Sequence, residues 1–275
     1  MARLATRRRD ALVAGLVALA MGAGCAAVRQ QLGLMFLPTE TEIQLGQEVA
    51  AQVEAQEKVL ADAEVQQYIG SVFGKVAQFA AQDRPEISYR VRVLDDPKQI
   101  NAFAVPGGHV YIYTGLLQLA ENEAEVAGVL AHELGHVVGR HSANQLGAQM
   151  GLAMLASIAL GEQPGELAKL TAQLLNASTM AAFSREDEEE ADKYGLRYAA
   201  AAGYSPAGLE SFFRKLLALE GDGHRGVFEG LLASHPATEE RIALLRRRIE
   251  RGSYAGGALE AERYQRIRAR LGSRR

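Results

Sequence analysis

The sequence HELGH at residues 132–136 constrains this chain more than any other feature, because it lies in a stretch whose apolar residues have helical spacing. On a helix, residues four positions apart share a face, so the imidazoles of His132 and His136 can bind one metal ion. Glu133 lies about 100° round the helix and can reach a water molecule beside that ion. Chance produces this pattern in about one such chain in a hundred. In such a chain, the two histidines would be buried residues whose ring nitrogens are satisfied by backbone carbonyls. We therefore predict a metal centre here, provided that the chain supplies a third ligand.

The third ligand is sought in the acidic run that begins at Glu186, because catalytic zinc requires three protein ligands and an open position. On a helix, Glu188 shares one face with a stripe of small or short residues, namely Ser184, Ala191, Asp192, Gly195, Ala199 and Ala202. Only this face allows close packing against another helix. We predict Glu188 as the third ligand and Asp192 as the acceptor for the free ring N–H of a ligand histidine. Glu186, Glu189 and Glu190 are predicted to face solvent.

A different zinc motif, HExxHxxGxxH, is excluded. It requires a glycine at position 139, which is present, and a histidine at position 142, where this chain has Ser142. His141 is one residue too early, and one residue rotates a side chain by about 100° on a continuous helix. We therefore interpret His141 as a structural or helix-end residue.

The rest of the chain reads as α+β and mostly α-helical, with one small sheet. Alternation of apolar and polar residues predicts a strand with one buried face, and two shorter strands follow around the turn Pro106-Gly107-Gly108. The predicted strands are residues 87–94, 101–105 and 109–113, and the predicted early helices are residues 44–56 and 59–79. From residue 121 onward the pattern is helical, with breaks at 161–165, 203–206, 221–226 and 252–257. The apolar segment 151–160 is short for a membrane span, so we expect a buried or lid helix.

The N-terminus has the order of a secretory signal, with basic residues, an apolar stretch and then small residues before Cys25. Cys25 is the single cysteine and is the expected lipid attachment point; cleavage to a soluble periplasmic form is the alternative. We divide the chain into a signal peptide (1–24), an N-terminal tether (25–39), a metal-binding catalytic domain (40–251) and a basic helical tail (252–275). The tail is expected to expose a solvated face, with contact to anionic lipid or a partner as the alternative.

The charge of the chain argues against nucleic acid as a partner. The formal net charge is −3 and becomes −6 from Cys25 onward, because the predicted signal carries four arginines and one aspartate. No basic field of the kind that binds a phosphate backbone is present in this composition. We therefore expect no nucleic-acid partner for this chain.

Four stretches resemble one family of zinc metallopeptidases, which includes HtpX, the CAAX prenyl endopeptidase and BepA (peptidase family M forty-eight). They are NAFAVPGG from Asn101, AHELGH from Ala131, FSR with the acidic run at 188–192, and SHP from Ser234 followed by Arg241. The family's Glu-x-x-x-Asp signature falls on Glu188 and Asp192. The resemblance implies a gluzincin fold, one zinc ion, and proteolysis of misfolded or membrane-associated proteins in the bacterial envelope. Because internal spans and a helical repeat are not recognisable, the chain resembles a stand-alone catalytic domain with a lipid anchor.

The expected mechanism uses zinc to acidify a water molecule and Glu133 as the general base that returns its proton to the leaving amine. Arg185, Arg241 and a histidine are candidates for holding the oxyanion. The resemblance implies that His235 is a removable fourth ligand that plugs the site; the alternative is a helix-entry residue before Pro236.

The substrate is expected to be polypeptide, from unfolded or misassembled envelope proteins. The segment Asn101, Ala102, Phe103 and Ala104 is expected either as an edge strand that pairs with the substrate main chain or as a covered hairpin strand. The alternative function is a zinc-stabilised envelope chaperone or assembly factor with little turnover. Glu133 argues against that alternative, since a structural metal site needs no general base.

Overall fold

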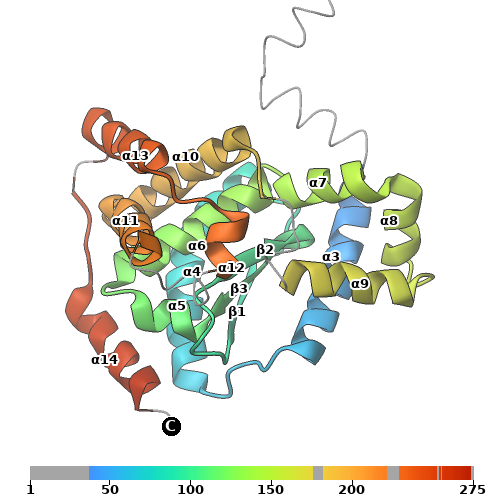
Figure 1. The fold of residues 1–275 in the computed structure, drawn as a ribbon, viewed down its shortest axis with the longest axis horizontal. Helices are drawn as coiled ribbons and strands as arrows, with labels where there is room; N and C mark the ends of the chain where they lie inside the picture. Colours follow the sequence, from blue (N-terminus) through green and yellow to red (C-terminus); the bar gives the residue numbers. More distant parts are fainter. Residues whose placement is uncertain (1–36, 176–181, 222–228, 253, 255, 274–275) are drawn as a thin grey trace, which may run out of the picture.

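The structure is a computed structural model that describes residues 37–175, 182–221, 229–252, 254 and 256–273. The predicted signal segment and Cys25 lie outside these residues. Within them, a three-stranded sheet has the order β1-β3-β2, with β1 parallel to β3 and β2 antiparallel to β3. The strands are β1 (Arg90–Leu94), β2 (Ala102–Val105) and β3 (His109–Tyr113). Helices surround this sheet (Figure 1), so the predicted mostly helical α+β class is confirmed.

The hairpin between β2 and β3 is closed by a short 3-10 turn at Pro106–Gly108. Gly107 and Gly108 have φ values of 77° and 93°, a region that side chains strain to occupy. Helix α3 (Thr39–Gln56) crosses directly over this turn, and a Cβ atom on Gly46 would lie only 2.0 Å from the Pro106 carbonyl oxygen. The glycines therefore fix the position of β2, which forms an edge of the sheet.

The described residues contain helices from α3 to α14, most of which the sequence predicted. Their bounds are α3 (Thr39–Gln56), α4 (Ala63–Asp83), α5 (Thr114–Leu119), α6 (Glu123–Val138), α7 (His141–Met150), α8 (Leu152–Ala159), α9 (Pro164–Leu175), α10 (Arg185–Ala201), α11 (Ala207–Gly221), α12 (Glu229–Ser234), α13 (Glu239–Arg251) and α14 (Ala261–Gly272). No described helix is both long and apolar enough to cross a bilayer. Helix α8 buries Leu155 and Ile158 against α3 and α9, as expected for a packed helix.

Several early boundaries differ from the prediction: α3 begins at Thr39 instead of residue 44, α4 ends at Asp83 instead of residue 79, and β1 begins at Arg90 instead of residue 87. The second helix begins at Ala63 instead of residue 59, because the Asp62 side chain accepts the first free backbone N–H groups of α4. Val59 pairs with Leu94 in an isolated bridge that extends the sheet. Helix α5 was not predicted, because its six residues follow β3 without an intervening turn signal.

Helix α6 carries the HELGH sequence and lies at the centre of the fold, with every one of its residues buried. The Asn122 side chain caps its N-terminus by accepting the Glu125 N–H at 3.0 Å. Helix α10 packs along α6 through the predicted face of small residues. A Cβ on Gly195 would lie 3.3 Å from the backbone of His132, and one on Gly135 would lie 2.8 Å from the Ala191 Cα. Glycine thus allows the two helices to approach closely enough for their side chains to share a site.

Helix α6 ends at Val138, and the chain reverses sharply before α7. Arg140 has a left-handed backbone with φ of 58°, which is unusual for a residue other than glycine. Its buried guanidinium donates to the Leu37 carbonyl at 2.5 Å and pairs with Glu42 at 2.8 Å. Contacts with Leu37 and with Glu42 of helix α3 therefore hold this turn in place.

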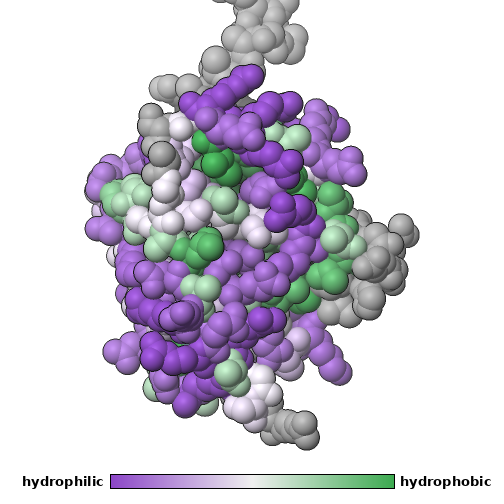
Figure 2. Space-filling model, turned by 90° about the vertical axis from the view of Figure 1, so that its left-hand side faces the viewer, coloured by the Kyte–Doolittle hydropathy of each residue, from purple (hydrophilic) through white to green (hydrophobic). Residues whose placement is uncertain are grey.

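Helix α14 packs on α5 and α6. Tyr264, Ile267 and Leu271 are buried, and the Tyr264 hydroxyl donates to the Leu117 carbonyl in α5 at 2.5 Å. Arg270 pairs with Asp62 at 2.6 Å. The side of the molecule formed by α13 and α14 is largely hydrophilic with isolated apolar patches (Figure 2). The tail thus has one solvated face and one face that belongs to the core.

Candidate metal centre

Four buried side chains converge on one point, namely His132, His136, Glu188 and His235. One possible ligand atom from each lies within 4.8 Å of all the others. The Nε2 atoms of His132 and His136 are 3.1 Å apart, and the two Glu188 oxygens lie 3.5 Å from one or the other of them. Because α6 supplies both histidines and α10 supplies the carboxylate, the cluster depends on the close packing of these helices.

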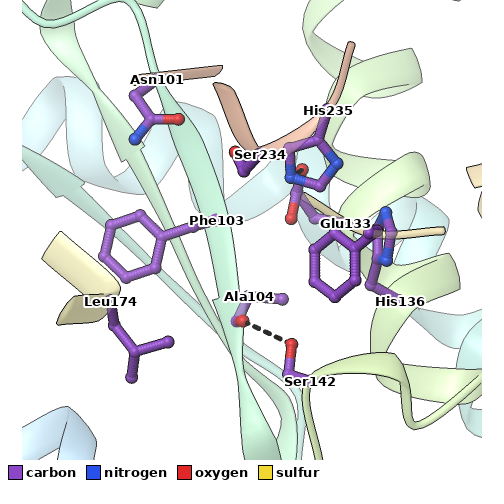
Figure 3. A pocket seen from close by; sticks show the side chains of 10 residues that line it. Asn101, Phe103, Ala104, Glu133, His136, Ser142, Leu174, Ser234 and His235 are labelled. Carbon is purple, nitrogen blue, oxygen red and sulfur yellow. Dashed lines mark hydrogen bonds and ion pairs between the residues drawn. The ribbon is translucent and has the colours of Figure 1, made fainter. Parts of the chain in front are cut away.

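His235 enters the cluster from the segment that follows α12. Its Nδ1 lies 2.9 Å from Glu188 Oε1 and 3.3 Å from His132 Nε2. Burial by itself would lower the pKa of His235, but the nearby carboxylates Glu188 and Glu133 raise it above the usual value. Figure 3 shows the ring beside Glu133. His235 therefore lies within reach of the same point as the other three side chains.

Glu133 lies next to the cluster and is buried. Burial raises its pKa to about 7, and its Oε1 has no hydrogen-bond partner. His235 Nε2 is 3.7 Å from that oxygen. The Ala104 backbone N–H contributes a hydrogen bond to the carboxylate. A carboxylate with a pKa near neutrality and one free oxygen is suited to accept and return a proton.

Asp192 lies behind His132, one turn along α10 from Glu188. Its Oδ1 is 3.1 Å from His132 Nδ1, so it can accept that ring N–H while Nε2 faces the cluster. Burial alone would raise the pKa of Asp192, but the Arg241 guanidinium, which donates at 2.7 Å, holds it well below its usual range. Asp192 is therefore an anion in this site.

The two candidate arginines occupy different environments. Arg241 is buried, and its Nη1 lies 2.5 Å from Glu188 Oε2 while its other nitrogens bind Asp192. Arg185 is 86% exposed in its side chain and pairs with Glu240 at the surface. The expectation that Arg185 helps at the site is wrong in this structure, because its position at the start of α10 directs the side chain to solvent.

The sequence interpretation missed one residue of the site's surroundings, Glu190. His141 begins α7, and its Nδ1 lies 2.9 Å from Nδ1 of His136. Glu190 was predicted to face solvent but lies 3.4 Å from His141 Nε2. The sequence signal for the position of His141 was Gly139. A glycine after a helix often ends that helix, so the rotation of about 100° per residue does not apply beyond it.

Strand β2 passes beside the cluster and forms one wall of a small cavity of about 30 Å³. Phe103, Leu174 and Phe183 make this cavity apolar, and Glu133 reaches it from α6. In Figure 3 the β2 ribbon runs between Phe103 and Leu174 on one side and the cluster on the other.

The edge of β2 has polar groups near the cavity. Asn101 is buried and its Oδ1 has no partner, whereas the Ala104 carbonyl accepts the Ser142 hydroxyl at 3.3 Å. Some backbone groups at this edge are already hydrogen-bonded to the protein's own side chains. Strand β2 is thus an edge strand whose side chains are buried.

The donor set fits a metal ion. Two imidazole nitrogens and one carboxylate oxygen are the ligands of a common class of catalytic zinc site, with an adjacent carboxylate as base. The unpartnered Oε1 of Glu133 agrees with this fit, because a buried carboxylate oxygen normally has a donor or a cation beside it. The fold and this site define a metallopeptidase of the HExxH class.

Comparison with known proteins identifies the family. Residues 63–249, more than half of the chain, match Peptidase family M48, and the chain belongs to this family. The mitochondrial metalloendopeptidase OMA1 of Schizosaccharomyces pombe is 30% identical over 177 residues, which cover 64% of this chain and 50% of that protein.

Bacterial relatives show the same level of similarity. The beta-barrel assembly-enhancing protease of Escherichia coli K12 is 29% identical over 216 residues, covering 75% of this chain and 43% of that protein. The metalloprotease YcaL of the same organism is 32% identical over 170 residues, covering 60% and 63%. The chain spans about half the length of the first two relatives.

Proposed function

We propose that this protein is a zinc-dependent endopeptidase of the bacterial cell envelope that cleaves misfolded or membrane-associated proteins. The observation that carries this proposal is the convergence of His132, His136 and Glu188 beside a free oxygen of Glu133. Similarity to a beta-barrel assembly-enhancing protease supports the envelope and the substrate class. Export behind residues 1–24 and anchoring through a lipid on Cys25 complete the proposal.

Each residue has a distinct part in the proposed mechanism. His132, His136 and Glu188 would hold the zinc ion, which polarises the scissile carbonyl and makes a water molecule more acidic. Glu133 accepts the proton of that water and delivers it to the departing amine, a cycle that suits a pKa of about 7. Asp192 fixes the ring of His132 through the 3.1 Å contact to Nδ1. Arg241 pairs with both α10 carboxylates and is the buried arginine proposed to help hold the oxyanion.

Substrate is proposed to bind as an added strand at the edge of β2. Backbone groups of residues 101–104 then pair with the substrate main chain, once Ala104 gives up its bonds to Glu133 and Ser142, and main-chain pairing tolerates many sequences. The Asn101 amide, whose Oδ1 has no partner, supplies a further polar contact. The cavity lined by Phe103, Leu174 and Phe183 receives an apolar substrate side chain, so we expect broad specificity with an apolar preference.

His235 is proposed to act as a removable fourth ligand. Its Nδ1 lies within 3.3 Å of both His132 Nε2 and Glu188 Oε1, a position that an incoming substrate or water needs. Displacement of His235 then opens the site. If His235→Ala leaves both peptidase activity and the spectrum of a cobalt-substituted site unchanged, this role is excluded.

The central test compares wild type with Glu133→Gln on casein and on an unfolded outer-membrane protein. The glutamine keeps the shape of the side chain but cannot accept a proton, so we expect cleavage to fall by at least about 100-fold with zinc content unchanged. Glu186→Gln, an exposed substitution on α10, serves as the matched control. Equal residual cleavage by wild type and Glu133→Gln would instead favour an envelope chaperone or assembly factor.

A further inference from the structure

The two histidines of α6 have different partners behind their rings. Both direct Nε2 toward the shared point, where these atoms lie 3.1 Å apart. His132 has the Asp192 carboxylate 3.1 Å from its Nδ1. The atom 2.9 Å from Nδ1 of His136 is a ring nitrogen, Nδ1 of His141. The ring of His136 is therefore contacted from behind by a second imidazole, that of His141.

Hydrogen-bond chemistry assigns one proton arrangement to this pair when His136 presents a lone pair at Nε2. A neutral imidazole carries one N–H, so Nδ1 of His136 must be the donor and Nδ1 of His141 the acceptor. The proton of His141 is then on Nε2. That atom faces Glu190 Oε2 at 3.4 Å, which can accept it, while Asp187 Oδ1 lies beyond hydrogen-bond distance at 3.8 Å.

The backbone around His141 is built to hold its ring in this place. A Cβ on Gly139 would lie 2.3 Å from Nε2 of His141, so any side chain at position 139 would displace the ring. The left-handed Arg140, held by Glu42 at 2.8 Å, reverses the chain and returns His141 toward α6. His141 itself is only 4% exposed. These contacts leave the imidazole little freedom to turn away.

We propose that His141 and Glu190 are positioning residues that hold His136 with its proton on Nδ1 and its Nε2 free for the metal. Asp192 has the corresponding part for His132, so each ligand histidine is oriented from behind by a different element. This inference rests on the proposed zinc site. It assigns Glu190, a residue of the acidic run that was expected to face solvent, to the support of that site.

The test uses the full chain with two substitutions and a control. His141→Phe keeps a ring beside Gly139 but removes both hydrogen bonds, and Glu190→Ala removes the terminal acceptor while leaving the ring. Glu186→Ala, on the exposed side of the same helix, is the matched control. Zinc affinity is measured by competition with a chromophoric chelator. We expect roughly 10- to 100-fold weaker binding for His141→Phe, a smaller loss for Glu190→Ala and no change for the control.

A second readout follows the proton itself. In ¹⁵N–¹H correlation spectra of the metal-free protein, His136 should show the Nδ1–H form in wild type, and His141→Phe and Glu190→Ala should redistribute it. Zinc binding within twofold of wild type, together with an unchanged His136 spectrum in both variants, would overturn the inference. Failure of wild type to bind zinc would reject the proposed function instead, while the metal-free spectra would still test the orientation of His136. If His141→Phe does not fold, Glu190→Ala provides the same two readouts.

Discussion

Arg241 and Asp192 form a buried two-point ion pair, in which Nε donates to Oδ2 and Nη2 donates to Oδ1, each at 2.7 Å. The remaining terminal nitrogen of the guanidinium lies against Glu188. One cation on α13 therefore neutralises two carboxylates on α10. Without it, two buried negative charges would face each other across one helical turn.

Replacement of Arg241 by methionine should destabilise the protein strongly. Removing one member of a buried pair leaves the partner charge without compensation, which typically costs about 3 kcal/mol or more. Chemical denaturation of the metal-free protein measures this loss. Arg247→Met, an exposed position on the same helix, should change stability by less than about 0.5 kcal/mol. Equal stability of the two variants would mean that the pair contributes nothing.

The contact between α6 and α10 should not tolerate a methyl group at Gly135. A Cβ there would lie 2.8 Å from the Cα and carbonyl oxygen of Ala191, so a backbone must move. We expect Gly135→Ala to cost roughly 1–3 kcal/mol and to weaken zinc binding by separating Glu188 from the histidines. Gly74→Ala on α4 meets nothing within 4 Å and should stabilise by roughly 0.5–1 kcal/mol. Thermal unfolding and zinc titration of both variants check this contrast.

Removal of zinc should lower the melting temperature. A ligand that binds only the folded state at 100 times its Kd adds about 2.7 kcal/mol, which corresponds to roughly 5–10 °C for a chain of this size. Calorimetry with excess zinc and with chelator measures the difference. His136→Ala should melt at the same temperature in both conditions. A zinc-dependent shift that survives this substitution would place the ion elsewhere.

The cavity beside β2 should control which substrates are cut. The side chain introduced by Leu174→Trp adds more volume than the cavity of about 30 Å³ can accept. We therefore expect cleavage of substrates with bulky apolar residues to fall, while zinc affinity stays unchanged. Lys169→Trp on the exposed side of α9 is the control. Profiling of a peptide library reads out the preference. An identical cleavage profile for all three proteins would exclude the cavity as a substrate subsite.

Helix α14 should contribute to the stability of the whole fold, although it has only 12 residues. Tyr264 is fully buried and donates to Leu117, so Tyr264→Ala should cost about 4 kcal/mol through lost packing and an unpaired carbonyl. Arg266→Ala on the exposed face should be close to neutral. Denaturation curves of the two variants distinguish a docked helix from a dispensable tail.

Local sequence was sufficient for the parts of the site that lie on continuous helices. Rotation of about 100° per residue places Glu188 and Asp192 on the face that Gly195 allows to pack, and the structure has that face against α6. The hairpin from β2 to β3 followed equally from the turn signal Pro106-Gly107-Gly108 between two short strands. In each case the residues that determine the local structure lie within one continuous segment.

Contacts between distant segments could not be predicted in this way. The position of His141 depends on the left-handed Arg140, and Arg140 is held by Glu42 in α3. Similarly, the choice between Arg185 and Arg241 depends on how α13 lies against α10. Helical rotation gives no information about either packing, since both are decided by tertiary structure.

The cluster draws on residues separated by as many as 103 positions along the chain, from His132 to His235. A polypeptide that has emerged only as far as α9 holds the HELGH pair but no Glu188, no Asp192 and no Arg241. Hydrolytic competence therefore requires α6, α10 and the segment after α12 to be present together. A nascent chain of that length holds two of the three proposed metal ligands and lacks the rest of the site.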